Sequence, residues 1–254
     1  MDSIYPVLSG ALAQEKRLEV ITNNLANINT SGFKKDIALF EGINGEQRDP
    51  TIKHGLGPSS PSAMFSKINQ IHTDFTPGPI RMTGEPLDVA ISGEGFFAVQ
   101  TPVGTRYTRN GHFTLNAERE IVTQGGFQVL GSGGPISIPN GTIMIDAEGR
   151  VSVKDSEIIG GSPVEVDLLP VFRFENSDAL QKVGSTLFDA GRAQATPSTE
   201  ARIRQGALEG SNVNSIEEMV AMISVSRRYE AAQKAMQTAD EITGKAANEV
   251  GRLA

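Results

Sequence analysis

"NNLANINTSGFKKD", residues 23–36, ends a helical pattern with several asparagines and a sharp break at Thr30-Ser31-Gly32. Upstream of the break, residues recur at alternating spacings of three and four, which indicates one face of an amphipathic helix. The positions on this face are Ile4, Val7, Ala11, Gln14, Leu18, Ile21, Leu25 and Ile28, and only Gln14 is polar. Gly32 stands where such a helix is expected to stop. We therefore predict an N-terminal helical region over residues 1–32.

The C-terminal end carries a second stripe of this kind. Ser215 is suited to cap a helix, and Glu217 and Glu218 follow in the first turn, where negative charge is favourable. The stripe consists of Met222, Val225, Tyr229, Ala232, Met236, Ala239, Thr243, Ala246 and Val250. Its apolar face is widened by Ile216, Met219, Val220 and Ile223. The pattern alone also fits two helices of an ordinary globular domain.

The middle of the chain has the pattern of β-strands. Short runs rich in aromatic and β-branched residues are separated by turns that contain Gly, Pro or Asn. The predicted strands are 96–99, 106–108, 112–115, 127–130, 142–145 and a longer run at 164–174, in which Pro170 forces an edge or a bend. "NAEREIVT" (116–123) and "DAEGRVSV" (146–153) look like two copies of one hairpin turn followed by a strand.

These patterns predict an α+β fold with an all-β central body between two terminal helices. Residues 33–80 are largely polar and rich in Pro and Gly, so we expect an extended connector there. The β-rich central domain is predicted at 81–206. The C-terminal helical region, with its lead-in, is predicted at 207–254.

Composition excludes several functional classes. The chain of 254 residues has a formal net charge of −7, whereas nucleic-acid binding needs clustered Lys and Arg. Cysteine is absent, so a disulfide or a cysteine metal site is excluded. No apolar run of about 18 residues predicts a membrane span, and no secretory signal peptide is recognisable. If the protein leaves the cytoplasm, we expect a route that needs no such peptide.

No catalytic constellation stands out. The three histidines form no metal-binding spacing, and no nucleophile elbow is present. The glycine-rich stretches at 92–97 and 131–135 fit turns or bulges better than phosphate loops, because neither opens a helix. No spacing selects an acid–base pair among the carboxylates Asp88, Glu94, Asp146 and Glu148. We expect no catalytic residue, cofactor or metal, although a secreted β-rich binding protein or hydrolase stays an alternative.

Three quoted segments, in order, resemble the bacterial flagellar basal-body rod protein family. The N-terminal signature matches at Asn23, Asn24, Leu25, Ala26, Asn27, Thr30, Gly32, Phe33 and Lys34. Residues 86–115 are similar to the β-domain core of the family, and 208–240 to its C-terminal helix and lead-in. Within the family, "MDSIYPVLSGA" (1–11) and "QGALEGSNVN" (205–214) look most like proximal rod subunits, with distal rod subunits as the close alternative.

The resemblance implies a structural role and a set of partners. In this family the terminal helices pair as a coiled coil, and copies stack into a hollow rod that transmits torque and encloses the export channel. Family members are exported unfolded through the flagellar type III apparatus without a cleaved signal peptide and assemble in the periplasm, which the rod crosses. The implied partners are rod subunits, copies of the chain and the export apparatus, with no nucleic acid, small-molecule substrate or membrane insertion. The expected helix interface comprises Ile4, Leu18, Ile21, Leu25, Ile28, Ile223, Tyr229, Ala232 and Met236.

Three local expectations follow, two from the signature and one from a departure from the family pattern at Arg119. The amides of Asn23, Asn24 and Asn27 are expected to bind adjacent subunits, where a neutral group costs less to desolvate than a charge. Phe33 is expected to anchor the connector on a neighbour. Arg119 stands where the family usually has Gly in the first hairpin turn, so we expect that turn to be rebuilt, whereas the second copy keeps Gly149.

Overall fold

The structure is a computed structural model that describes residues 4–44, 64–154 and 162–250, and it divides into two compact units. Within the described residues, unit 1 is drawn from 1–25, 36–72 and 215–254, and unit 2 from 26–35 and 73–214. Both helices belong to unit 1, and nearly all of the β-structure belongs to unit 2. The predicted α+β class with a largely β central body is thereby confirmed.

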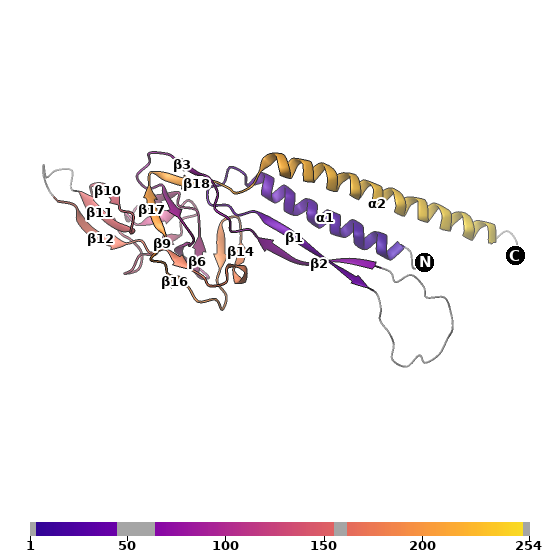
Figure 1. The fold of residues 1–254 in the computed structure, drawn as a ribbon, viewed down its shortest axis with the longest axis horizontal. Helices are drawn as coiled ribbons and strands as arrows, with labels where there is room; N and C mark the ends of the chain where they lie inside the picture. Colours follow the sequence, from indigo (N-terminus) through magenta and orange to yellow (C-terminus); the bar gives the residue numbers. More distant parts are fainter. Residues whose placement is uncertain (1–3, 45–63, 155–161, 251–254) are drawn as a thin grey trace, which may run out of the picture. The chain divides into compact units, whose positions relative to one another are not determined.

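Unit 1 contains α1 (Ile4–Ala26), α2 (Ser215–Val250) and the strands β1 (Asp36–Asn44) and β2 (Met64–Thr73), which pair as a two-stranded sheet. The two helices are the long coiled ribbons of Figure 1. The polar sequence at 33–80, rich in Pro and Gly, predicts only an extended connector and does not predict these paired strands. Their apolar positions are spaced irregularly among polar residues, so alternation gave no clear strand signal.

Helix α1 ends at Ala26, earlier than the expected stop at Gly32. Residues 27–29 form turns, so Ile28 is not helical, although its spacing continues the stripe. Of the expected stripe, Ala11 and Ile21 are buried, while Leu18 and Leu25 are half-buried. The predicted face is thus buried only in part, and Ala13, Val20 and Asn24, which lie off it, are buried as well. The asparagine-rich segment leaves the helix before the pattern ends.

Helix α2 buries the predicted stripe only in part. Val225 is buried, and Met222, Tyr229, Ala232, Met236 and Ala239 are half-buried. The residues expected to widen the apolar face are exposed, and these are Ile216, Met219, Val220 and Ile223. Ile223 is therefore not packed within this chain, and its expected role at an interface between subunits stays a prediction.

Unit 2 is built of short strands connected by turns. In chain order they are β3 (Ile80–Met82), β4 (Val89–Ser92), β5 (Phe97–Thr101), β6 (Gly104–Thr108), β7 (Phe113–Leu115), β8 (Ile121–Thr123), β9 (Gln128–Val129), β10 (Thr142–Ile145), β11 (Arg150–Lys154), β12 (Val164–Leu168), β13 (Phe172–Arg173), β14 (Gln181–Val183), β15 (Leu187–Asp189), β16 (Thr196–Pro197), β17 (Arg202–Gln205) and β18 (Ala207–Glu209). One 3₁₀ turn, η1, spans Ser177–Ala179. The run predicted at 164–174 is divided around Pro170, and β12 is an edge strand.

The strand order brings late segments beside early ones. The largest sheet has the order β14-β15-β6-β5-β9-β8-β7, and a second sheet has the order β10-β11-β12. Two small antiparallel sheets pair β17 with β4 and β18 with β3. The segment that leads into α2 is therefore fixed next to the strands that begin unit 2.

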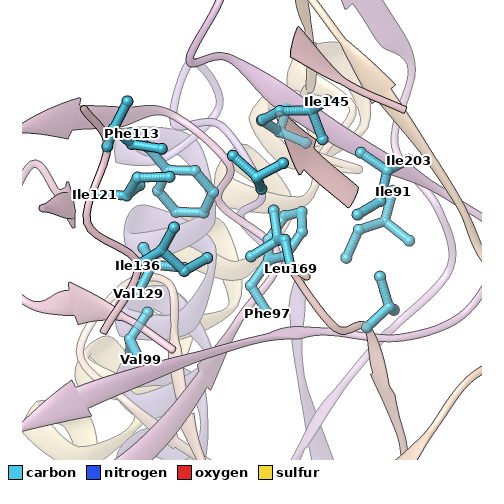
Figure 2. Close-up of a cluster of buried hydrophobic side chains, with 14 of the residues drawn as sticks. Ile91, Phe97, Val99, Phe113, Ile121, Val129, Ile136, Ile145, Leu169 and Ile203 are labelled. Carbon is cyan, nitrogen blue, oxygen red and sulfur yellow. The ribbon is translucent and has the colours of Figure 1, made fainter. Parts of the chain in front are cut away.

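The main core of unit 2 gathers inward-facing residues from several sheets (Figure 2). In β11, for example, Val151 and Val153 are buried while their neighbours are more exposed, as expected from the two-residue period of a strand. The labelled side chains in the figure are Ile91, Phe97, Val99, Phe113, Ile121, Val129, Ile136, Ile145, Leu169 and Ile203. A second hydrophobic cluster is mainly aromatic and joins Phe96, Phe174 and Phe188 with Leu180.

The two hairpin turns share one geometry. Asn116 Oδ1 accepts a hydrogen bond from Glu120 N at 2.7 Å, and Asp146 Oδ1 accepts one from Arg150 N at 2.8 Å. Arg119 has a φ of 61°, in the left-handed region that Gly149 also occupies. The expectation that this turn is rebuilt is therefore wrong. The Arg119 guanidinium donates to the carbonyls of Ile138 and Pro139, both at 2.8 Å, and these bonds offset the backbone strain.

Candidate functional site: the chain-end junction

Residues 30–35 and 207–213 meet within unit 2, and we call this region, together with Arg109 and Lys182, the chain-end junction. Strand β18 sets its geometry, because Leu208 pairs with Arg81 and Glu209 with Ile80 in the antiparallel register. Alternation along β18 directs Ala207 and Glu209 inward, where both are buried, and leaves Leu208 half-buried. A carboxylate is thereby placed in the interior.

Gly32 allows the N-terminal segment to approach the β-structure closely. It has a φ of 68°, and its N–H donates to the Glu209 carbonyl at 2.8 Å. A Cβ at this position would collide with the backbone of Asn110. Only glycine meets both requirements, the left-handed backbone and the absence of a side chain.

Phe33 is fully buried within the chain. The ammonium of Lys182 lies 3.8 Å from the centroid of its ring and also donates to the Lys34 carbonyl at 2.6 Å. A cation over an aromatic face is a favourable contact. The expectation that Phe33 anchors the connector on a neighbour is therefore wrong, because its side chain is already covered by unit 2.

Lys34, Arg109 and Glu209 form a buried ion cluster, with each side chain at most 3% exposed. Glu209 Oε1 accepts from Lys34 Nζ at 2.7 Å, and Oε2 accepts from Arg109 Nε at 2.9 Å. The Gly78 N–H also donates to Oε1 at 2.9 Å. Burial lowers the pKa of Lys34, although the neighbouring Glu209 carboxylate opposes this shift.

The same cluster accounts for the glycine-rich stretch at 92–97. The guanidinium of Arg109 donates to the Gly93 carbonyl at 2.9 Å and to the Gly95 carbonyl at 2.6 Å. The stretch therefore presents carbonyl oxygens to a cation, the opposite polarity to a phosphate loop.

Asn212 extends the junction toward the C-terminal helix. Its Oδ1 accepts from Lys35 N at 2.7 Å, and its Nδ2 donates to the carbonyls of Asp74 at 2.8 Å and Thr76 at 3.2 Å. One amide thus joins three segments of unit 2. The lead-in to α2 and the segment that follows α1 are fastened to each other by these partly buried polar contacts.

In unit 1, Asn24 has a comparable role. It is 1% exposed, its Nδ2 donates to the Asp36 carbonyl at 2.9 Å, and its Oδ1 accepts from Asp36 N at 2.9 Å. Nδ2 also lies 3.4 Å from Glu218 Oε2. The side chain therefore links α1 to β1 and α2, and its expected contact with an adjacent subunit is wrong. The same expectation for Asn23 and Asn27 stays a prediction.

Part of this site coincides with the residues expected from the sequence. The signature residues Gly32, Phe33 and Lys34 belong to the junction, whereas Arg109, Lys182, Glu209 and Asn212 were not singled out. An inward position for Glu209 could have been suspected from its spacing of two from Ala207. The side chain of Ile4 lies outside what the structure describes, so its predicted interface role is untested.

The carboxylates considered for acid–base chemistry have separate partners. Asp88 Oδ1 lies 2.6 Å from His112 Nδ1, and Glu148 lies 2.9 Å from Arg202. Asp146 holds a hairpin turn, and Glu94 lies 3.8 Å from Arg173. In the described part of the chain, no group of three or more His, Asp or Glu residues could hold a metal ion. No described helix is long and apolar enough to span a membrane.

Three family models match the chain in order along its length. Residues 4–34 match "Flagella basal body rod protein", residues 90–153 match "Flagellar hook protein FlgE/F/G D1 domain", and residues 204–249 match "Flagellar basal body rod FlgEFG protein C-terminal". The buried ion cluster takes one residue from each match, since Lys34, Arg109 and Glu209 lie in the first, second and third regions.

Full-length relatives carry two names. The chain is 38% identical to the flagellar basal-body rod protein FlgG of Borreliella burgdorferi over 265 positions, with 98% of each chain covered. It is 35% identical to the rod protein FlgF of Caulobacter vibrioides over 254 positions, with 99% of each covered. The Bacillus subtilis FlgG is 34% identical over 263 positions, covering 97% of this chain and 98% of the relative.

Proposed function

The chain belongs to the flagellar basal-body rod protein family and is a structural subunit of the rod, and we propose that it occupies the proximal part. The alignment with the Caulobacter FlgF needs few insertions relative to this chain, because its length almost equals the number of chain residues that it covers. The two FlgG alignments run over more positions than the chain residues that they cover, so they require insertions. This difference in length supports the FlgF type. The higher identity to the Borreliella FlgG keeps the distal rod as the alternative.

The proposed assembly rests on an exposed apolar face of α2, which is distinct from the partly buried stripe that begins at Met222 and which we call the α2 stripe. Its members Ile216, Met219, Val220 and Ile223 follow the spacing of one helix face and are 46% to 68% exposed. Leu8 and Leu12 of α1 are exposed as well. Large apolar side chains gathered on one face mark a surface that is covered in an assembly.

We propose that the terminal helices pair as a coiled coil in the assembled rod and that neighbouring subunits cover the stripe. Burial of apolar surface contributes about 25 cal/mol per Å², which favours such packing. The predicted interface residues Leu18, Ile21, Leu25, Tyr229, Ala232 and Met236 are buried or half-buried in unit 1, which supports their use in contacts between helices, whereas Ile28 lies in unit 2.

In the proposed assembly, the rod transmits torque to the hook, encloses the export channel and crosses the periplasm. A shaft that transmits torque needs rigid connections within each subunit. The chain-end junction holds the segment that follows α1 against the segment that precedes α2. We propose that the chain travels unfolded through the flagellar type III apparatus and polymerises along the rod axis.

Replacing Val220 with Asp tests the assembly. Val220 is 63% exposed, so the monomer is expected to keep its fold, whereas a buried charge in the rod interface should prevent incorporation. We expect Val220→Asp cells to lose motility and to yield basal bodies without the chain. Gln233→Asp, at an exposed polar position of the same helix, is the matched control and should assemble.

Circular dichroism of the purified variants would show that both keep wild-type helix content. Normal rods and swimming in Val220→Asp would refute the proposed interface. A separate experiment, mass spectrometry of crosslinked hook–basal bodies, would identify the neighbours of the chain and so distinguish the proximal from the distal position.

A further inference from the structure

Strand β3 of unit 2 is exposed over its whole length. Ile80 is 37% exposed, Met82 is 69% exposed, and Arg81 between them is exposed too. Its described sheet contains only β18 as a second strand. The Pro79 carbonyl and the Thr83 N–H are hydrogen-bonded to the two residues that flank β18, Gly210 and Gly206. Successive residues of an antiparallel strand direct their backbone groups to opposite sides, so those of Ile80 and Met82 face the open edge. An open edge with apolar side chains is a site for contact with another chain.

A small pocket lies beside this strand. It is lined by Ile28, Asn29, Ser31, Arg81, Thr83, Leu208 and Gly210, and its volume is about 190 Å³. Binding sites for small molecules usually have about 300–1,000 Å³. The pocket therefore has room for one inserted side chain rather than a cofactor.

The chemistry of the pocket selects the kind of side chain. Arg81 is the one charged residue in its lining, and Ile28 and Leu208 supply apolar surface. In the part of the chain that the structure describes, no acidic residue pairs with Arg81, whereas Arg106 pairs with Asp189 at 3.0 Å and Arg202 with Glu148 at 2.9 Å. A glutamate fits, because its methylene stem would pack on the apolar wall and its carboxylate would meet the guanidinium.

We propose that the open edge of β3 and this pocket, which we call the β3 surface, bind an acidic segment of a second copy of this chain in the rod. The inference rests on the proposed function, since rod subunits assemble with copies of themselves. The chain has 30 Asp and Glu against 23 Lys and Arg, so each copy offers acidic partners for an unpaired arginine. The β3 surface lies outside the terminal helices and adds a second contact between subunits.

Photo-crosslinking in cells tests the β3 surface. The chain is produced with p-benzoylphenylalanine at one of three exposed apolar positions, Met82 in β3, Val103 in the turn between β5 and β6, or Val220 in the α2 stripe. Basal bodies are isolated after irradiation. We expect the probe at Met82 to give a product that contains two copies of the chain, and the probe at Val103 to give none.

Charge reversal tests the pocket. Arg81→Glu, combined with the Met82 probe, should lower the yield of the product roughly tenfold, the size expected for a lost charge-assisted contact. Arg192→Glu is the matched control, because Arg192 is also exposed, lacks a described acidic partner and lies outside the pocket lining. It changes the net charge equally and should leave the yield unchanged. Equal thermal melting of both variants would show that folding is not affected.

The outcomes separate this inference from the proposed function. A product at Val220 without one at Met82 would overturn the β3 surface and leave the rod assignment standing. A product at Met82 that contains a different protein would overturn the second copy as the occupant. Equal loss in Arg81→Glu and Arg192→Glu would overturn the role of the pocket. Absence of the chain from basal bodies would overturn the proposed function itself.

Discussion

The Glu209 carboxylate accepts hydrogen bonds from two buried cations and one backbone amide. A buried ion pair contributes little net stability compared with an apolar pair of the same shape, but removing one partner is costly. The remaining charges then lie in the interior without compensation. The cluster consequently specifies which segments meet at the junction more than it adds to the stability of the fold.

We expect Glu209→Ala to lower the free energy of unfolding by about 3–5 kcal/mol, because two buried cations lose their counter-charge. Glu148→Ala, which removes an exposed partner of Arg202, should cost at most about 1 kcal/mol. Urea unfolding followed by circular dichroism measures both. Adding Lys34→Met to Glu209→Ala should recover part of the loss, since one uncompensated charge is removed. Equal costs at Glu209 and Glu148 would contradict this account.

Arg119 offers a test of backbone strain at a single position. Arg119→Ala keeps the left-handed conformation and loses the bonds to Ile138 and Pro139. Arg119→Gly loses the same bonds but relieves a backbone cost of about 1–2 kcal/mol. We expect the glycine variant to be the more stable of the two by about 1 kcal/mol in urea unfolding. Equal stability would show that the turn is not strained.

At the scale of elements, the signature ends α1 and begins the junction. The side-chain amide of Asn24 bonds to the backbone N–H and carbonyl of Asp36, the first residue of β1. Gly32 lets the backbone lie close to that of Asn110. The asparagines that follow the apolar stripe are thus explained in part by contacts within the chain. Hydrogen bonds of neutral amides satisfy buried backbone groups at lower cost than charges would.

Two glycines of this region should respond in opposite directions to alanine. Gly32→Ala introduces a clash and a strained backbone, so we expect a loss of at least about 2 kcal/mol in stability. Gly10 lies inside α1 and has open space around it, so Gly10→Ala should raise stability by up to about 1 kcal/mol through helix propensity. Thermal unfolding by far-ultraviolet circular dichroism compares them. A neutral Gly32→Ala variant would contradict the close approach.

At the scale of the whole molecule, unit 2 is completed by residues far along the chain. Lys34 and Glu209 are separated by 175 positions, and β17 and β18 pair with β4 and β3. Ile203 and Ala207 are buried from these late strands. Long-range pairing of this kind forms late, because the loop entropy must be overcome before the contacts stabilise it.

Truncation tests this closure. A chain that ends at Asn214 lacks α2 but keeps all of unit 2, and we expect it to show a cooperative thermal transition of its β-structure. A chain that ends at Glu200 also lacks β17 and β18 and leaves Lys34 and Arg109 without Glu209. We expect no cooperative transition there, as measured by calorimetry. A cooperative transition in the shorter chain would show that the late strands are dispensable.

The sequence by itself determined the features that depend on short range. The spacing of three and four predicted both helices, turn residues predicted most strands of the central body, and the repeated pattern at 116–123 and 146–153 predicted two related hairpin turns, although the first was expected to be rebuilt at Arg119. Rotamer, turn and cap preferences act over a few residues, so a linear pattern is sufficient to express them.

Only the tertiary structure decided where α1 ends, that β1 and β2 pair, that Asn24 and Phe33 are used within the chain, and that the α2 stripe is left exposed. It also decided the partners of Lys34. Which carboxylate meets a buried lysine depends on the register of β18 against β3, and a shift of one residue would turn Glu209 outward. That register is set by packing between segments distant in sequence, which no local pattern encodes.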